Sequence, residues 1–546
     1  MKTAIQYCTL FLSICLLCIN CGTKKENIVF DANNGGLFLP DGFGAVVVAD
    51  SIGPSRHIAV KENGDIYVKL KITSEAPGSV ALRDEDGDGK ADIIQPFGKY
   101  VNDGIFATGM RIHNGYLYYS TEKVVYRQKI DNDLVPTSKQ EIVLMDESDQ
   151  WHIAKPIAFD KEGNMYVPYS APSNACASFI NTTGTSVQQA GQYPCPELVN
   201  HGGIWKFKAN AINQTQKDGV QIGTGLRSIV AMNFNTSNNT LYAVQHGRDD
   251  LHLLWPNLYS AWQNAVTPAE EFFEIKEGNH YGWPYSYFDP LIKQKLQAPE
   301  YGGDGKKLAT DKSFTNPLAA FPAHWAPNDL LFYQGDQFPA RYKNGAFIAF
   351  HGSTNRGPYP QAGYIVAFIP FSDGKPSGAW EVFADGFAGV DTIVNVSDAQ
   401  YRPMGLAEGP DGSLYISDSK KGKIWRILYK EDKNKFNKTA LASMEQRKNT
   451  ATNIKTPDPI KDIIQIKYSK VGQTIYQTNC TNCHQANLKG DGNRYPSLIK
   501  SNYLNDKSSF RNLIYNGKGN MPGFKQLSSK EINELETYIQ SVISKQ

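Results

Sequence analysis

A short motif near the C-terminus carries the most specific chemistry in the sequence. Cys480 and Cys483 are separated by two residues, and His484 follows directly. Two thiols at this spacing can add to both vinyl groups of one porphyrin, and the adjacent histidine can then ligate the iron. Met521, which is followed by a proline, is the natural sixth ligand, and its thioether raises the potential of the iron. The sequence therefore predicts a covalently attached haem c held by His484 and Met521.

Other uses of a Cys-x-x-Cys pair fit less well. A zinc ribbon needs a second pair of ligands, and the sequence after Ala451 has no Cys or His outside this motif. A redox pair is expected inside a thioredoxin-like βαβ unit, which is absent here. Residues 471–478 can form a helix before the motif, and Ser528 with Glu531 forms a capping box before another helix. Along that second helix, apolar residues recur at helical spacing and are expected to pack against the haem: Ile532, Leu535, Ile539 and Val542.

A second cluster of possible ligands lies near the start of the chain. Its carboxylates are spaced two residues apart around a glycine turn, like the first half of an EF-hand loop. Gln95 stands where that loop would have its bidentate Glu. The pattern predicts a structural calcium site of modest affinity, with an acidic surface turn as the alternative. The expected ligands are Asp84, Asp86, Asp88 and Asp92.

The elements that position such residues are predicted by a repeat. A polar turn with Gly or Asn, followed by alternating aromatic and aliphatic residues, is typical of a hairpin leading into a half-buried strand. Six well-separated copies favour a six-bladed β-propeller over a β-sandwich, which would be unusual at this length. The copies are residues 63–68, 114–119, 162–167, 238–243, 344–349 and 411–416.

The predicted fold is thus an all-β six-bladed β-propeller followed by a small all-α cytochrome c domain. Long insertions at residues 255–265 and 285–317 are expected to build a rim around a central site. The Lys-, Asn- and Thr-rich composition of residues 430–470 indicates a solvated linker. The expected order is a lipoprotein signal peptide, a tether, the propeller, the linker and the cytochrome c domain, over residues 1–21, 22–38, 39–429, 430–470 and 471–546.

The N-terminus predicts export. Lys2 precedes a largely apolar stretch, residues 7–19, that is too short to cross a bilayer comfortably. Cys21 followed by Gly22 resembles a bacterial lipoprotein cleavage site, where the thiol is acylated. Asn20 is not the usual small residue, so ordinary signal cleavage remains the alternative. We expect a periplasmic protein, lipid-anchored to a bacterial membrane.

The remaining cysteines agree with export. Without the leader cysteines and the haem pair, only Cys176 and Cys195 are left. An oxidising compartment predicts a disulfide between them, with two buried free thiols as the alternative. The formal net charge is +2 and no long basic run occurs, which argues against nucleic acid as a partner.

Four further motifs occur in a fixed order along the propeller pattern, at residues 225–227, 278–284, 351–356 and 401–405. Together they resemble the sorbosone and pyranose dehydrogenases, which are relatives of soluble quinoprotein glucose dehydrogenase. The resemblance covers roughly residues 39–429, and the C-terminal cytochrome resembles that of fused quinohaem members. It implies pyrroloquinoline quinone (PQQ) on the top face of the propeller, a calcium ion beneath it, and oxidation of a sugar hydroxyl.

Candidate residues for binding such a quinone are arginines. PQQ carries three carboxylates, which arginines converging from different blades would bind by bidentate, charge-assisted pairs. Arg227, Arg356 and Arg402 lie in loops that flank predicted strands, and Arg56 lies just before the first strand. For each of them, a solvated surface arginine is the alternative.

A base must accept the hydroxyl proton, and histidine suits this role because its unperturbed pKa lies near neutrality. The resemblance implies His152, which precedes the strand ending at Val167, as the base. His351 is the second candidate, as a base or a cofactor contact, and an ordinary loop histidine is the alternative for either. The resemblance also implies that the backbone carbonyls of Gly247 and Arg248 bind the calcium ion.

The sequence thus predicts an exported quinohaem dehydrogenase that oxidises an aldose or a related pyranose or aldehyde. Electrons would pass through haem c to an external acceptor, such as a cytochrome or the respiratory chain. Two alternatives remain open. One is a non-catalytic propeller that binds glycan or protein beside an independent cytochrome, and the other is a calcium-dependent propeller lactonase.

Overall fold

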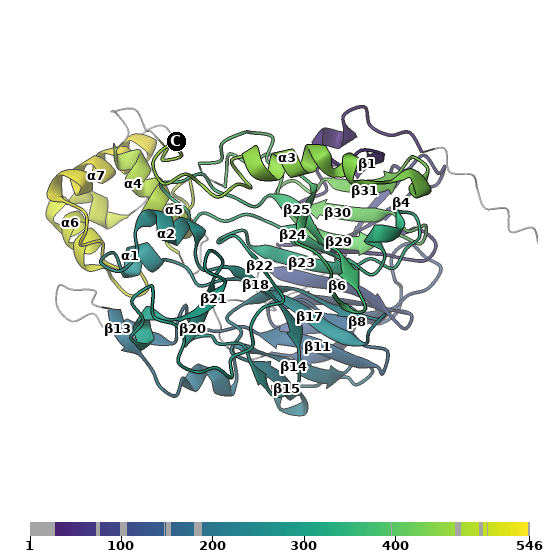
Figure 1. Ribbon diagram of the computed structural model, residues 1–546, viewed down its shortest axis with the longest axis horizontal. Helices are drawn as coiled ribbons and strands as arrows, with labels where there is room; N and C mark the ends of the chain where they lie inside the picture. Colours follow the sequence, from purple (N-terminus) through teal and green to yellow (C-terminus); the bar gives the residue numbers. More distant parts are fainter. Residues whose placement is uncertain are drawn as a thin grey trace, which may run out of the picture.

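The computed structural model describes residues 28–72, 77–98, 106–146, 148, 154–179, 188–394, 396–464, 471–490, 495–499 and 501–543. The predicted signal peptide, Cys21 and His152 lie outside the described residues. Six sheets of four or five strands form a six-bladed β-propeller, and a helical part follows at the C-terminal end (Figure 1). The predicted fold is confirmed.

Each of the first three blades has a core of four strands that pair antiparallel with their neighbours. Blade one contains β2 (Ser55–Val60), β3 (Ile66–Leu70), β4 (Ser79–Arg83) and β5 (Ile93–Phe97). Blade two contains β6 (Ala107–His113), β7 (Tyr116–Thr121), β8 (Val124–Lys129) and β9 (Glu141–Met145). Blade three contains β10 (Ala158–Phe159), β11 (Asn164–Tyr169), β14 (Gly203–Lys208) and β15 (Val220–Thr224), with β19 (Asn279–His280) at its edge.

The other three blades follow the same plan. Blade four contains β16 (Ile229–Asn235), β17 (Thr240–Gln245), β18 (Glu270–Ile275) and β22 (Ala319–Phe321). Blade five contains β23 (Pro327–Phe332), β24 (Ala346–Phe350), β25 (Ile365–Ile369) and β28 (Glu381–Ala384). Blade six contains β29 (Pro403–Glu408), β30 (Leu414–Asp418), β31 (Ile424–Tyr429) and β1 (Phe43–Ala49). Because β1 precedes blade one in the chain and pairs with β31, the two ends of the propeller close the ring together.

The six repeats of the sequence each produce the second strand of a blade. A type I′ hairpin turn needs positive φ at both central residues, which Asn and Gly tolerate best. Between β6 and β7, Asn114 and Gly115 have φ values of 47° and 76°. Since all second strands run in the same direction, the residues that follow them emerge on one face of the propeller. These residues are Lys71, Glu122, Ser170, His246, His351 and Ser419.

The first strands of the blades surround the centre, where β2 contacts β6 and β29, and β16 contacts β10 and β23. Arg111 on β6 and Asp329 on β23 form an ion pair of 2.5 Å between blades two and five. The Asp329 side chain is fully buried, and its other oxygen accepts from the backbone N–H of Leu406, 2.8 Å away. Loss of Arg111 would leave the buried Asp329 charge without its cation, which is strongly destabilising. The ion pair therefore links blades on opposite sides of the ring.

Short elements outside the blades are α1 (Leu251–Leu254), α2 (Ala261–Val266), β20 (Ser286–Asp289), β21 (Gln294–Gln297) and the hairpin of β12 (Ala177–Phe179) and β13 (Gln188–Gly191). A disulfide joins Cys176 to Cys195, which confirms the predicted pairing. A further small hairpin pairs β26 (Phe371–Ser372) with β27 (Lys375–Pro376). Short 3₁₀ turns are η1 (Asn34–Gly36), η2 (Pro196–Val199), η3 (Gln216–Asp218), η4 (Pro299–Tyr301) and η5 (Ala340–Tyr342).

The segment expected to be a solvated linker is packed over its described part, so that interpretation is wrong for residues 430–464. It forms η6 (Lys433–Lys435), η7 (Lys438–Leu441) and α3 (Ala442–Thr450), along one edge of the propeller (Figure 1). Met444 and Ile454 are each 2% exposed within a propeller core cluster. Arg447 donates to Asp385 at 2.7 Å. Residues 430–435 are exposed, so the contact with the propeller depends on buried apolar side chains and on polar pairs such as that of Arg447.

The C-terminal part consists of α4 (Val471–Asn479), α5 (Thr481–His484), η8 (Asn502–Asn505), α6 (Lys507–Asn516) and α7 (Ser529–Ile543). The helix before the haem motif is confirmed, as is the capping box, in which the Glu531 N–H donates to the Ser528 hydroxyl at 3.3 Å. Helix α4 crosses α7 closely, since a Cβ on Gly472 would lie 1.8 Å from the Glu534 carbonyl oxygen. Among the described residues, no helix combines the length and the apolar character that a membrane span requires.

Candidate functional site

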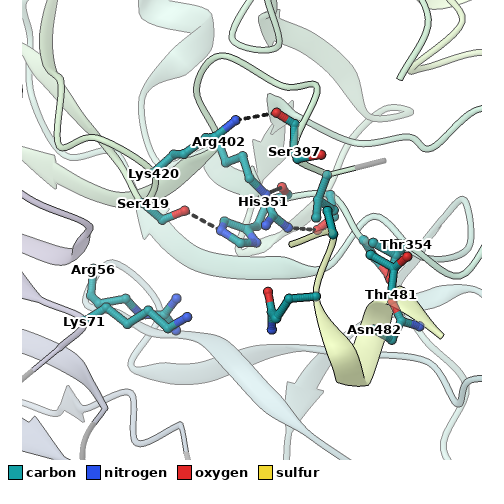
Figure 2. Close-up of a pocket in the computed structure, with 15 residues that line it drawn as sticks. Arg56, Lys71, His351, Thr354, Ser397, Arg402, Ser419, Lys420, Thr481 and Asn482 are labelled. Atoms are coloured by element: carbon teal, nitrogen blue, oxygen red, sulfur yellow. Dashed lines mark hydrogen bonds between the residues drawn. The ribbon is translucent and has the colours of Figure 1, made fainter. Parts of the chain in front are cut away.

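A cavity of about 480 Å³ lies between the propeller and the C-terminal helical part. Its walls come from blades one, five and six, from the segment before Arg402, and from α5 with the turn that follows it. Figure 2 shows Arg56 and Lys71 on one side and the haem-motif residues Thr481 and Asn482 on another. The lining residues are Arg56, Lys71, His351, Gly352, Ser353, Thr354, Val396, Ser397, Arg402, Ser419, Lys420, Thr481, Asn482, Gln485 and Ala486.

The cavity is strongly positive. Arg56, Lys71, Arg402 and Lys420 line it, and none of its fifteen described lining residues is an Asp or Glu. Burial and the neighbouring Arg402 guanidinium lower the pKa of Arg56 to about 10. Burial also lowers the pKa of Lys420, with Arg402 as a second cause. Cations held this close without lining carboxylates favour an anion with several charges.

Arg402 is fixed by backbone carbonyls. Its Nε donates to the His351 carbonyl oxygen at 3.0 Å, and its Nη2 donates to that of Gly352 at 2.5 Å. Its own backbone N–H donates to Asp418 at 2.7 Å. The side chain is therefore preorganised at the wall of the cavity and pays little conformational entropy when a ligand binds.

His351 also lines the cavity, and its Nε2 shares a hydrogen bond of 2.5 Å with the Ser419 hydroxyl (Figure 2). Burial holds the pKa of His351 well below its usual value, and the charges of Arg402, Arg56 and Lys71 lower it further. The imidazole is therefore neutral at pH 7. A neutral histidine beside several cations can contact an anionic ligand without adding charge of its own.

These features fit the quinone that the sequence motifs imply. The Nε of Arg56 is buried and has no hydrogen-bond partner among the described residues. Such an orphan donor is costly unless a ligand or water accepts from it. A ligand with three carboxylates would satisfy this donor and offset the four positive side chains, so the cavity suits PQQ.

Of the four arginines expected to bind PQQ, Arg56 and Arg402 line the cavity, whereas Arg227 and Arg356 do not. Arg227 is 3% exposed and forms an ion pair of 2.8 Å with Asp249, so its charge is already compensated. Arg356 is 1% exposed, and its Nε and Nη1 have no partner among the described residues. The sequence correctly placed both residues in loops, but their side chains turn into the protein.

Of the two backbone carbonyls expected to bind calcium, that of Gly247 already has a partner, whereas that of Arg248 stays a prediction. The Gly247 carbonyl oxygen accepts a hydrogen bond of 2.8 Å from Nη1 of Arg227. The Arg248 side chain is buried and paired with Glu300. A calcium ion at that carbonyl would sit beside a fixed guanidinium, and the repulsion between the two cations opposes binding.

The C-terminal part fits a haem. Neither Cys480 nor Cys483 is part of a disulfide, and Cys480 lies in an apolar cluster with Leu535 at its core and Met521 at its margin. The ring Nδ1 of His484 lies 2.9 Å from the Pro496 carbonyl oxygen. Since a carbonyl can only accept, Nδ1 carries the hydrogen and Nε2 keeps the lone pair that an iron ligand needs. Burial raises the pKa of the Cys480 thiol to about 12, as expected for a thiol in an apolar pocket. The apolar residues expected to flank the haem, Ile532, Leu535, Ile539 and Val542, all belong to or pack against this cluster.

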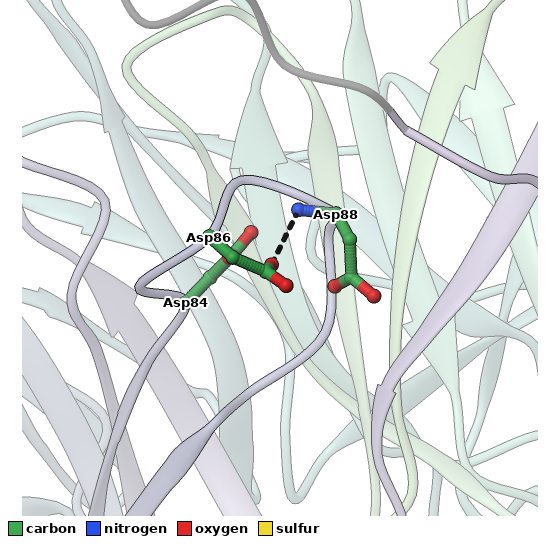
Figure 3. Close-up of side chains that lie close together, drawn as sticks. All are labelled: Asp84, Asp86 and Asp88. Atoms are coloured by element: carbon green, nitrogen blue, oxygen red, sulfur yellow. Dashed lines mark hydrogen bonds between the residues drawn. The ribbon is translucent and has the colours of Figure 1, made fainter.

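The acidic loop brings three of its four expected ligands together. Carboxylate oxygens of Asp84, Asp86 and Asp88 lie within 4.8 Å of one another (Figure 3). Asp92 instead accepts a hydrogen bond of 2.7 Å from the backbone N–H of Glu85 and lies outside that group. Calcium at this loop stays a prediction.

Lys71, Ser419 and Lys420 line the cavity but were not predicted from the sequence. Each follows the second strand of a blade, as His351 does. The repeat that predicted the strands therefore also contained the signal for these residues, because every position just after such a strand lies on the same face of the propeller. The repeat gave no indication that Thr481, Asn482, Gln485 and Ala486, in and just after α5, line the same cavity.

Comparisons with known proteins match both parts of the chain. The TrAA12-like family matches residues 37–430, and the family described as cytochrome C oxidase, cbb3-type, subunit III matches residues 469–539. A PQQ-dependent sugar dehydrogenase of Hypocrea jecorina is 22% identical over 441 residues, which cover 75% of this chain and 86% of that protein.

Two further relatives are informative. An uncharacterized protein of Borreliella burgdorferi is 30% identical over 222 residues, and the match spans about half of that protein, 52%, and 40% of this chain. The holo form of the PQQ domain of pyranose dehydrogenase from Coprinopsis cinerea has a TM-score of 0.55 and 16% identity. That comparison covers 72% of this chain and 97% of the solved chain, and it shows a shared fold. This chain therefore belongs to the TrAA12-like family, with a C-terminal cytochrome c domain joined to its propeller.

Proposed function

We propose that this protein is an exported quinohaem dehydrogenase that oxidises a sugar with PQQ and passes the electrons through haem c to an external acceptor. One observation carries the proposal. The positive cavity of the propeller is also lined by residues of the haem motif, Thr481 and Asn482, and by Gln485 and Ala486 just after it. An independent electron carrier would have no reason to share a wall with the ligand site.

Each part of the chain would hold one cofactor. Arg56, Lys71, Arg402 and Lys420 would bind the carboxylates of PQQ, and Cys480, Cys483, His484 and Met521 would hold haem c. Bound there, PQQ would accept a hydride and haem c would accept single electrons. Oxidation of one sugar hydroxyl releases two electrons and two protons, so each cycle must reduce the iron twice.

The two candidate histidines take different roles in this proposal. The low pKa of His351 makes it a weak base, while its place beside Arg402 suits contact with the cofactor. We therefore assign the base to His152, as the family resemblance implies, and assign cofactor contact to His351. Binding of an anionic cofactor would partly offset the charges that lower the pKa of His351.

The location and the further partners are part of the proposal. The apolar leader before Cys21 supports export to the periplasm and lipid attachment to a bacterial membrane, where haem c is also attached. Substrates would be aldoses or related pyranoses and aldehydes, and the acceptor a cytochrome or the respiratory chain. We propose calcium only at the acidic loop of Asp84, Asp86 and Asp88, where it would be structural.

The test uses the full chain produced with its haem attached. The protein is incubated with PQQ, a panel of sugars is added, and the absorption band of Fe(II) haem is followed. We expect at least one aldose to reduce the haem only when PQQ is present. If dithionite reduces the haem but no sugar does, the dehydrogenase assignment is wrong. Hydrolysis of a lactone without haem reduction would instead support the lactonase alternative.

A further inference from the structure

The loop after β24 runs from the cavity to the cytochrome c domain. His351, Gly352, Ser353 and Thr354 line the cavity, and the next residue, Asn355, leaves it. The Oδ1 of Asn355 accepts a hydrogen bond from the side-chain amide of Asn482, which lies between the two haem cysteines. One loop of the propeller thus contacts both the cofactor cavity and the haem motif.

Asn355 is fixed from the propeller side. Its amide Nδ2 donates to Oδ1 of Asp249, and its backbone carbonyl accepts from the side chain of Asn264 on α2 at 2.7 Å. Asp249 is in turn paired with Arg227 at 2.8 Å. The side-chain Nδ2 and the backbone carbonyl of Asn355 are therefore both held by the TrAA12-like part of the chain, which leaves Oδ1 for Asn482.

The charge of Asp249 also determines how the Asn355 amide is oriented. Burial alone would raise the pKa of Asp249, but the Arg227 guanidinium, with His324 and Asn355, holds it well below its usual value. Asp249 is thus an anion, which can only accept, so it must face the NH₂ of Asn355. The opposite oxygen of the amide is left facing the cytochrome as an acceptor for Asn482.

The cytochrome side fits closely beside this bond. A Cβ on Gly357 would lie 3.0 Å from Cγ2 of Thr478, so the absence of a side chain lets α4 approach the loop. The segment before the cytochrome is also held, since Trp262 donates to the Pro457 carbonyl at 2.7 Å and Tyr359 donates to that of Pro459 at 2.9 Å. These contacts bring the chain to the interface, and the hydrogen bond from Asn482 to Asn355 joins the haem motif itself to the propeller.

We propose that Asn355 is a positioning residue, which docks the haem motif at the cofactor cavity through Asn482. The inference rests on the proposed function, because docking matters for catalysis only if electrons move from the cavity to the haem. Asn355 does not line the cavity. Its effect is on the distance and orientation between the two parts, to which electron transfer is sensitive.

The test compares Asn355→Ala, Asn482→Ala and the double variant with Asn449→Ala. Asn449 is an exposed residue of α3 that donates only to Glu445 within its own helix, so it is a matched control. Two rates are measured after sugar is added to the PQQ-loaded protein, namely reduction of the haem and reduction of a small soluble dye that takes electrons directly from the propeller. Haem reduction should slow about tenfold in either single variant, the change that one lost hydrogen bond can make. Dye reduction should stay within about twofold of wild type, since the propeller itself is unchanged.

The double variant should be no slower than the slower single variant, because both substitutions remove the same contact. Equal loss of haem and dye reduction in Asn355→Ala would mean a merely structural role, and an unchanged haem rate would mean no role. Either result overturns the proposal.

A second readout needs neither sugar nor PQQ. Hydrogen exchange of the peptides around residues 351–359 and 480–486 should be faster in Asn355→Ala than in wild type and unchanged in Asn449→Ala. Unchanged protection in Asn355→Ala would overturn the docking proposal even if no sugar reduces the haem. If these peptides are more protected in wild type than in Asn355→Ala but no sugar reduces the haem of wild type, the proposed function is wrong and the docking proposal is supported.

Discussion

Nη1 of Arg227 donates a hydrogen bond of 2.8 Å to the carbonyl oxygen of Gly247. The resemblance to the sorbosone and pyranose dehydrogenases implies that this carbonyl binds calcium. The guanidinium is held there by its ion pair with Asp249, and the Gly247 N–H is held by Glu270 at 2.8 Å. The carbonyl that the family resemblance implies as a calcium ligand thus already accepts a hydrogen bond from a protein cation.

Removal of calcium should not weaken PQQ binding. With the Gly247 carbonyl occupied, the positive charge at the cofactor site comes from protein side chains. The dissociation constant of PQQ, measured by fluorescence quenching, should change by less than about twofold between EDTA and excess calcium. A dependence of about tenfold or more would contradict this view.

The matched variant is Arg227→Ala, which frees the carbonyl and leaves Asp249 without its cation. Calcium titration by calorimetry should detect one more bound ion in this variant than in wild type. To separate the acidic loop, both titrations are repeated with Asp86→Asn, which should remove only the structural site.

Replacement of Arg402 by Ala should weaken PQQ binding by about 10- to 100-fold. The reason is the loss of a preorganised charge-assisted hydrogen bond, which contributes about 1.5–3 kcal/mol. Arg83→Ala is the control, because Arg83 pairs with Asp65 and does not line the cavity. Equal PQQ affinities of the two variants would exclude Arg402 as a cofactor contact.

Substitution of the two histidines should separate catalysis from cofactor binding. His152→Ala should lower kcat by about 10²- to 10⁴-fold with little change in PQQ affinity, as expected when a general base is removed. His351→Ala should mainly weaken PQQ binding, because His351 lines the cavity with a depressed pKa. Steady-state kinetics at saturating PQQ, together with a PQQ titration, checks both. The assignment of roles is wrong if kcat at saturating PQQ falls only in His351→Ala.

Met521→Ala should lower the midpoint potential of the haem. A thioether ligand favours Fe(II), and Met521 lies at the margin of the apolar cluster that contains Cys480. The expected shift is on the order of 100 mV, measured by spectroelectrochemical titration. The control is Met444→Leu, in the segment packed on the propeller, which should leave the potential unchanged. If Met521→Ala has the same potential as wild type, another residue must be the sixth ligand.

Glu270 should make stability depend on pH. Burial raises the pKa of Glu270 to about 7 from an ordinary value of 4.5, so the folded state binds this proton more tightly than the unfolded state. The stabilising effect of the protonated form is complete below about pH 4.5, falls as the pH rises, and is lost above about pH 7. The thermal stability of wild type relative to Glu270→Gln should therefore decrease across this window and stay constant above it, as followed by calorimetry. A constant difference from pH 4.5 to 8 would mean that Glu270 is ionised throughout.

Much of the fold could be predicted because its signals are local. Each polar turn followed by alternating residues produced the second strand of one blade, as with Asn114 and Gly115 before β7. The capping box of Ser528 and Glu531 likewise marked the start of α7. Composition was a poorer guide for residues 430–464, since one buried side chain such as Met444 outweighs many polar neighbours once the segment has a surface to pack on.

The sequence by itself determined the chemistry of this protein: the thiol pair and histidine for a haem, the turn repeat for the blades, and arginines at loop positions for an anionic cofactor. Only the tertiary structure decided which side chains meet. It placed Lys71 and Lys420 beside Arg402, turned Arg227 toward Gly247, and brought Asn482 to Asn355 across the two parts of the chain. The physical reason is that residue type and spacing report local geometry, whereas contacts between blades and between domains depend on how the ring closes and which charges compensate one another.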